Sequence, residues 1–159
     1  YQNNSKDIGR FLIMVTIYTI GFTKKSLEEF VNLLRENNIT KLIDIRLNRN
    51  SQLFGFAKER DIKYILEEFL NMKYEVISEF APTEELRKEY QKDKDWEKYE
   101  KGFLKIIKER NLEKFKGKVL DDKERICLLC SEPEPDNCHR RLISEFFSKL
   151  GSNVNIKHL

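Results

Sequence analysis

Hydrophobic residues along the chain fall into two patterns that alternate from one end to the other. Between polar turns, continuous apolar runs predict buried strands at residues 14–20, 41–46, 74–78, 125–130 and 153–157. Elsewhere, apolar residues recur three and four positions apart, as they do on the buried face of a helix. The predicted order of elements is β-α-β-α-β-α-α-β-α-β.

The helices are predicted from this spacing and from the residues at their ends. Ser26 and Glu29 form a capping box, in which each side chain accepts a hydrogen bond from a free backbone amide at the helix start. Pro82-Thr83 opens a charged helical region. Helical spacing also predicts helices around 62–69, 96–110 and 138–150.

Strands that alternate with helices form a mostly parallel sheet with helices on both faces. We therefore predict an α/β fold of three layers, with about five strands in the sheet. Residues 14–159 are expected to form a single α/β domain, which is long enough to bury a core. Met14 has the character of a natural start, so residues 1–13 are expected to be an upstream or artificially added extension.

Composition restricts the class of protein more than its function. Hydrophobic residues make up 40% and charged residues 36% of the 159, which is typical of a folded domain with a solvated surface. The net charge of +3 is too small to indicate nucleic-acid binding by itself. No apolar run reaches the ~20 residues of a membrane span. The apolar stretch 10–22 lacks the cleavage pattern of a signal peptide.

The cysteines favour a cytoplasmic protein with reduced thiols, because their number is odd and the sequence shows no secretion signal. The three cysteines are Cys127, Cys130 and Cys138. Residues three apart in a strand point to opposite faces, so we expect Cys127 in the core and Cys130 near a site at the strand end. Membrane association is not expected, and the sequence does not predict an oligomeric state.

Open parallel sheets bind ligands beyond the carboxyl ends of their strands. The loops at that edge are expected to contribute Thr23, Arg46, Arg49, Ser51, Cys130 and Glu132. Arginine forks suit phosphate or carboxylate groups, so this edge predicts an anion site. Two alternatives stay open: both arginines lie in a solvated loop, or Asp44 is the buried partner of a helix terminus or of an arginine.

The start of the last helix gives the sharpest clue in the sequence. With Asp136 or Asn137 as the N-cap, the run Cys138-His139-Arg140-Arg141 occupies the first turn. Cations there oppose the helix dipole by a few tenths to ~1 kcal/mol each, and a bound anion would resolve the conflict. The alternative is that Glu132, Glu134 and Asp136 neutralise the turn.

The same segment suggests reactive groups. The helix terminus lowers the pKa of a thiol at Cys138, which makes Cys138 a candidate nucleophile; the alternative is a small residue that packs there. Cys130, Cys138 and His139 can supply three metal ligands, whereas a structural zinc needs four. We therefore assign no metal ligand and no cofactor. The Cys-x5-Arg loop of tyrosine phosphatases is not matched, because Asp136 stands at the arginine position.

Several short motifs together resemble one protein family from about residue 15 to the C-terminus. They are Thr19-Ile20-Gly21-Phe22-Thr23, Ser26-Leu27-Glu28-Glu29-Phe30, Leu42-Ile43-Asp44-Ile45-Arg46, Phe54-Gly55-Phe56, Ala81-Pro82-Thr83 with Asp95-Trp96, Cys130-Ser131-Glu132 and Cys138-His139-Arg140-Arg141-Leu142. The chain thus resembles the domain-of-unknown-function family 488, which implies a small α/β protein of unassigned activity. Phe22 stands where many relatives have histidine.

The resemblance supports the fold and the choice of Arg46, Cys130, Glu132, Cys138, His139 and Arg140, but it supplies no reaction. We expect a small enzyme that binds an anionic substrate, phosphate- or carboxylate-bearing and including nucleotides, at the carboxyl edge of the sheet. Arg46 and Arg140 would bind the anion, and His139 would transfer a proton. Cys138 or Glu132 would act as nucleophile or base. The alternatives are a non-catalytic module that binds nucleic acid or regulates, and a metal-binding domain.

Overall fold

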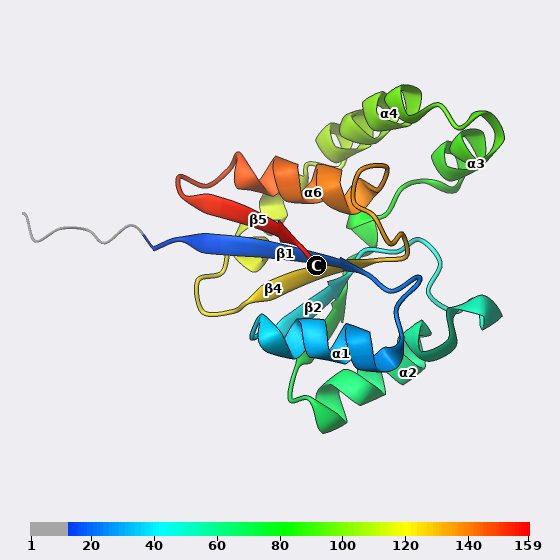
Figure 1. The fold of residues 1–159 in the computed structure, drawn as a ribbon. Helices are drawn as coiled ribbons and strands as arrows, with labels where there is room; N and C mark the ends of the chain where they lie inside the picture. The colour runs from blue at the N-terminus through cyan, green and yellow to red at the C-terminus, as the bar shows by residue number, and fades with distance from the viewer. Residues whose placement is uncertain (1–12) are drawn as a thin grey trace, which may run out of the picture.

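A computed structural model describes residues 13–159 of the protein; the predicted extension at 1–13 lies outside this range except for its last residue. Five strands form one sheet in the order β3-β2-β4-β1-β5, and every neighbouring pair is parallel (Figure 1). The strands are β1 (Val15–Gly21), β2 (Lys41–Asp44), β3 (Lys73–Val76), β4 (Ile126–Cys130) and β5 (Val154–His158). The predicted α/β sheet is confirmed, and it is entirely rather than mostly parallel.

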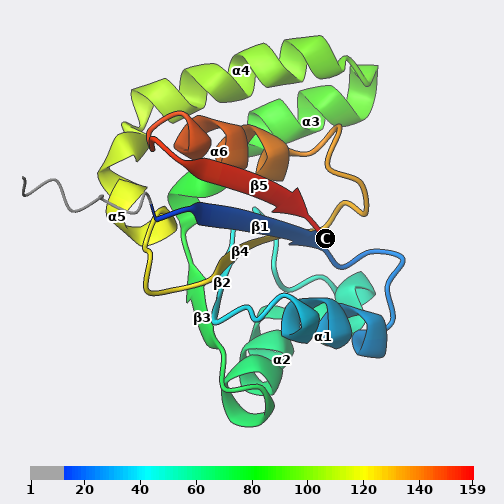
Figure 2. The ribbon, with the colours of Figure 1, turned by 60° about the vertical axis from the view of Figure 1, so that its left-hand side comes forward.

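Helices cover both faces of the sheet, as the alternating pattern predicts (Figures 1 and 2). One face carries α1 (Leu27–Glu36) and α2 (Glu59–Tyr64), which continues into a π-helical turn at Ile65–Phe69. The other face carries α3 (Glu84–Asp93), α4 (Trp96–Glu109) and α6 (His139–Ser148), with the short α5 (Lys116–Val119) near the start of β4. Short 3₁₀ helices lie at Gln52–Ala57, Ser78–Phe80 and Leu112–Phe115.

The core is divided by the sheet into two clusters, because successive side chains of a strand point to opposite faces. On β4, Cys127 and Leu129 pack toward α1 and α2, whereas Leu128 and Cys130 pack toward α4 and α6. All five residues of β4 are buried, which explains why this strand is a continuous apolar run in the sequence. Cys127 therefore lies in the core, as predicted.

The capping box predicted at the start of the first helix is present in the structure. The Ser26 side chain accepts a hydrogen bond from the Glu29 amide, and the Glu29 side chain accepts one from the Ser26 amide, so the predicted capping box begins α1. Among residues 13–159, no helix is both long and apolar enough to cross a bilayer.

The chain connections open a crevice between the carboxyl ends of β2 and β4. The segment after β2 runs along the face of α1 and α2, whereas the segment after β4 leads to α6 on the opposite face (Figures 1 and 2). Neighbouring strands whose connections diverge in this way mark the usual ligand site of an open α/β sheet. The register places Asp44 beside Leu129, so the ends of the two strands are level.

Candidate functional site

A cavity of about 420 Å³ occupies this crevice, and side chains from three parts of the chain line it. The floor is formed by Cys130, Cys138 and His139. One wall belongs to the loop after β2, with Arg46, Asn48, Ser51 and Phe54. The opposite wall comes from α3 and α4, with Arg87, Tyr90, Gln91, Lys94, Trp96 and Tyr99, and the β4–α6 loop adds Ser131, Glu132 and Asn137.

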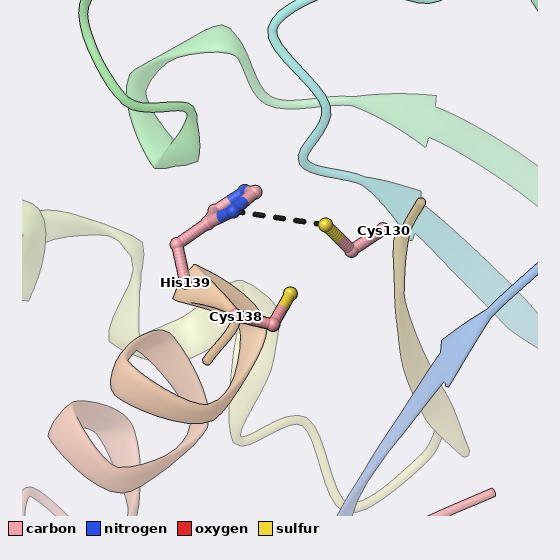
Figure 3. Close-up of side chains that lie close together, drawn as sticks. All are labelled: Cys130, Cys138 and His139. Atoms are coloured by element: carbon pink, nitrogen blue, oxygen red, sulfur yellow. Dashed lines mark hydrogen bonds between the residues drawn. The ribbon is translucent and has the colours of Figure 1, made fainter. Parts of the chain in front are cut away.

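The floor is a compact cluster of two thiols and an imidazole (Figure 3). Cys130 Sγ lies 3.6 Å from His139 Nδ1, and the reactive atoms of Cys130, Cys138 and His139 all lie within 4.8 Å of one another. All three side chains are buried. The other ring nitrogen of His139, Nε2, lies 2.8 Å from the carbonyl oxygen of Ile45, so it carries the proton and donates to that carbonyl.

The cluster shifts the proton affinity of its members in different directions. The pKa of Cys130 lies well below its ordinary value, because the Cys138 thiol donates a hydrogen bond to Cys130 and His139 is close by. Burial raises the pKa of Cys138, and the neighbouring Cys130 raises it further. Burial alone would lower the pKa of His139, but the contact with Cys130 raises it overall. Of the two thiols, Cys130 is therefore the one that ionises more readily.

The last helix begins at His139, and its N-cap is Cys138 rather than Asp136 or Asn137. Cys138 is the N-cap of α6, and its sulfur accepts a hydrogen bond from the Arg140 amide at 3.5 Å. The prediction of Asp136 or Asn137 as the cap was wrong. Polar residues are the stronger caps in general, but here the chain is still in a turn at those positions and enters the helix at His139.

Arg140 is buried, and its positive charge at the start of α6 is compensated by the protein itself without an external anion. Its Nη2 donates to the Pro133 carbonyl at 3.1 Å, and its Nη1 donates to the Glu132 carbonyl. Arg141, the next cation, donates to the Asp136 carbonyl and pairs with Glu145. Backbone carbonyl oxygens thus neutralise much of the positive charge in the first turn of α6. The alternative prediction had assigned this role to carboxylates. Arg140 does not line the cavity, and its guanidinium instead ties the β4–α6 loop to the first turn of α6.

Arg46 lies at the cavity wall and is almost fully buried. Its Nε and Nη2 donate to the two carboxylate oxygens of Asp44, and Nη1 donates to the Ala57 carbonyl at 2.6 Å. The guanidinium also lies against the rings of Phe22 and Phe54, which contact each other, at 5.3 and 5.4 Å from their centres. The predicted alternative of Asp44 as the buried partner of an arginine is therefore what the structure contains.

The remaining predicted residues are divided between the cavity and other surfaces. Ser51 lines the cavity, and its hydroxyl caps the 3₁₀ helix that begins at Gln52. Arg49 pairs with Glu59 at 3.0 Å and does not reach the cavity. Thr23 is exposed and lines a separate shallow groove beside α1. Glu132 lines the cavity and is exposed.

The wall contributed by α3 and α4 was not predicted from the sequence. Tyr90, Trp96 and Tyr99 form a contiguous aromatic cluster, with ring centres 5.0–5.8 Å apart. α3 contains no fully buried residue, and its apolar side chains Leu86 and Tyr90 pack partly buried against the core cluster on this face. Arg87 and Lys94 bring positive charge to this wall.

The chain was compared with known proteins in three ways. A family model described as "Domain of unknown function DUF488" matches residues 26–147. Neither the comparison with curated proteins nor the comparison with solved structures gives a match. The matched segment begins at the cap of α1 and ends within α6, so it includes every residue at the floor of the cavity.

Proposed function

The chain belongs to the DUF488 family, whose function is unknown, and we propose that it is a small enzyme acting on an anionic substrate in the cavity between β2 and β4. One observation carries the proposal. The cations Arg46, Arg87 and Lys94 line the cavity with a single carboxylate, Glu132, above a floor of two thiols and an imidazole. A substrate with a phosphate or carboxylate group fits this charge balance, and a nucleotide is the form to be tested first.

The cations differ in how much of their binding capacity the protein already uses. A guanidinium has five N–H donors, and Arg46 uses three of them on Asp44 and Ala57, which leaves one on each terminal nitrogen. Arg87 pairs with Glu84 through Nη2, while its Nε is buried without a hydrogen-bond partner. The Lys94 ammonium lies over the Tyr90 ring. Each cation therefore has donors available for an anion.

The aromatic wall would favour a substrate that is partly flat and apolar. Phe54 faces the cavity from the loop after β2, and Tyr90 and Trp96 face it from the helices. Side chains of this kind exclude water, which strengthens electrostatic contacts inside the cavity. Ligand sites commonly combine such apolar walls with a few placed polar groups.

The reaction would centre on the floor. Cys130 and His139 are in contact, so a proton can pass between Sγ and Nδ1 across 3.6 Å. Because Cys130 ionises more readily than Cys138, the proposal assigns the reactive sulfur to Cys130 and makes Cys138 its hydrogen-bond donor. Glu132 is placed at the rim, where it can exchange a proton with bound substrate.

Thermal unfolding of the full chain tests the anion site. We expect phosphate, sulfate or a nucleoside monophosphate to raise the stability above that in chloride at equal ionic strength. The gain is about 1.4 kcal/mol when the ligand concentration is ten times its dissociation constant. Lys94→Asn removes a cavity cation and should reduce the shift. Lys92→Asn removes an exposed cation from the same helix, outside the cavity, and should preserve it. No specific shift with any anion would overturn the proposal.

The same protein distinguishes an enzyme site from a nucleic-acid-binding module. Binding to nucleic acid weakens steeply with salt, because each contact releases counterions from the phosphate backbone. If an oligonucleotide binds with such a slope while mononucleotides cause no shift, the non-catalytic alternative is favoured. A shift with small anions that persists at moderate salt favours the cavity.

A further inference from the structure

Three side chains with metal-binding atoms converge at the floor of the cavity from a short stretch of chain. Cys130 is the last residue of β4, and Cys138 and His139 begin α6. The intervening loop turns back so that the two sulfurs and the imidazole lie within 4.8 Å of one another (Figure 3). All three are buried, so the cluster is fixed by packing rather than by chance proximity of mobile surface groups.

The distance between Cys130 and His139 matches that of two ligands on a tetrahedral zinc ion. Zinc–sulfur bonds of about 2.3 Å and zinc–nitrogen bonds of about 2.0–2.1 Å place the two ligand atoms about 3.5 Å apart at a tetrahedral angle. Cys130 Sγ and His139 Nδ1 are 3.6 Å apart. An ion could therefore enter between them with little movement of either side chain.

The surroundings of His139 also fit a metal ligand. Its Nε2 donates to the Ile45 carbonyl at 2.8 Å, which leaves the lone pair of a neutral ring on Nδ1, directed at the sulfurs. Metal-binding histidines almost always donate their second N–H to a carbonyl or carboxylate in this manner. The Phe103 ring meets the imidazole at 5.6 Å, nearly edge to face, and holds its orientation.

Two sulfurs within 4.8 Å of one imidazole nitrogen are more than a thiolate–imidazolium pair requires. The Cys138 sulfur accepts the backbone N–H of Arg140 at 3.5 Å. Amide hydrogen bonds of this kind support sulfur that carries negative charge, as metal-bound thiolates do. A metal ion accounts for both cysteines, whereas a single nucleophile accounts for one.

We propose that Cys130, Cys138 and His139 bind one Zn²⁺ ion whose fourth coordination position faces the cavity. Two thiolates neutralise the ion, and sulfur ligands favour zinc over calcium or magnesium. Among residues 13–159, no fourth histidine, cysteine or carboxylate joins the cluster, and all three ligands line the cavity. Three protein ligands with an open position are typical of catalytic rather than structural zinc. This inference rests on the anion site of the proposed function, since the open position is where the anionic substrate would bind. It replaces the proton transfer between Cys130 and His139, because their Sγ and Nδ1 atoms would hold the metal instead.

Metal content and cobalt spectroscopy of the full, untagged chain test the proposal. We expect one equivalent of zinc in protein purified with reductant, and replacement by Co²⁺ with the thiolate-to-cobalt charge-transfer band and strong visible bands of a tetrahedral site. Cys130→Ala, Cys138→Ala and His139→Ala should each lower the affinity by more than the roughly 10- to 100-fold that loss of a supporting residue costs. Cys127→Ala is the matched control, because Cys127 is buried in the other core cluster and should leave one equivalent bound.

Far-ultraviolet circular dichroism of each variant separates loss of a ligand from loss of the fold. A wild-type chain that is reduced and folded yet binds neither Zn²⁺ nor Co²⁺ would overturn the proposal, as would loss of metal from Cys127→Ala equal to that from Cys138→Ala. The anion shift distinguishes the two proposals. If it persists in metal-free protein that cannot take up zinc, the anion site stands without the metal. If zinc binds and no anion has an effect, the metal site stands without the proposed function.

Discussion

The Asp44 carboxylate and the Arg46 guanidinium form a two-point ion pair in the interior, with Nε–Oδ1 at 2.9 Å and Nη2–Oδ2 at 2.7 Å. Neither side chain exposes more than 1% of its surface. Tyr74 donates from β3 to the same carboxylate at 2.5 Å. Burial alone would lower the pKa of Arg46, but the hydrogen bonds with Asp44 raise it overall, so the arginine stays charged.

Arg46→Ala should therefore be strongly destabilising. It leaves the Asp44 carboxylate buried without its partner, which costs about 3–5 kcal/mol of unfolding free energy. Urea denaturation measures the loss. Arg49→Ala is the control, because the Arg49–Glu59 pair is partly exposed and such pairs contribute about 1 kcal/mol or less. Equal effects of the two substitutions would contradict the importance of the buried pair.

The environment of Tyr74 should make the free energy of unfolding depend on pH in the alkaline range. Burial raises the pKa of Tyr74, and the adjacent Asp44 carboxylate raises it further. The unfolded chain then releases the phenol proton first, so unfolding becomes easier as pH rises above the ordinary tyrosine value of about 10. The loss should not exceed about 1.4 kcal/mol per pH unit, because a single proton is involved. Tyr74→Phe should have a shallower slope, and identical slopes would refute the shift.

At Gly21 the β4–α6 loop packs directly against the end of β1. A Cβ at Gly21 would overlap the Glu132 carbonyl and the Arg140 guanidinium. Gly21→Ala should then destabilise the protein by about 1–3 kcal/mol through overpacking, measured by thermal or urea unfolding. Gly117→Ala is the matched change in a site with open space, and it should be neutral or stabilising by up to about 1 kcal/mol. Similar losses at both positions would show that the close approach is unimportant.

The fold could be predicted from the sequence because strands that are buried on both faces consist of continuous runs of apolar residues. The five residues of β4 are all apolar or cysteine and all buried, and the helices between strands have one apolar face. The alternation of strands and helices also predicted which edge of the sheet holds the site, because it implies parallel strands whose carboxyl ends lie together. Arg46, Ser51, Cys130, Glu132 and the start of α6 do meet at one cavity, because parallel strands end together.

The other half of the cavity could not be predicted, since it depends on how α3 and α4 pack across the strand ends. No local pattern tells whether Tyr90 and Trp96 face a core or a ligand. Arg140 shows a second limit. A cation in the first turn of a helix suggests a bound anion, but the loop before α6 supplies carbonyl oxygens whose position only the folded chain reveals.

Lys94 combines backbone strain with a position at the cavity wall. It ends α3 in the left-handed region, with φ of 56°, which favours glycine. Lys94→Gly should raise the unfolding free energy by up to about 1 kcal/mol and yet reduce the anion-induced shift in thermal unfolding. Lys24 has φ of 62° and lies outside the cavity, so Lys24→Gly should gain stability without affecting anions. A parallel loss of anion response in Lys24→Gly would show that net charge, not the cavity, is responsible.

Cys138 is both a helix cap and a proposed zinc ligand, and the two roles respond oppositely to one substitution. Serine accepts the Arg140 amide better than sulfur does, so Cys138→Ser should stabilise metal-free protein by a few tenths to ~1 kcal/mol. With zinc at a hundred times its dissociation constant, the wild type gains about 2.7 kcal/mol that the variant cannot match. The order of stability should therefore invert when zinc replaces chelator in a urea titration. Cys127→Ser places a hydroxyl in an apolar core and should cost about 1–3 kcal/mol under both conditions. If Cys138→Ser behaves as Cys127→Ser does, Cys138 is a packing residue and neither role holds.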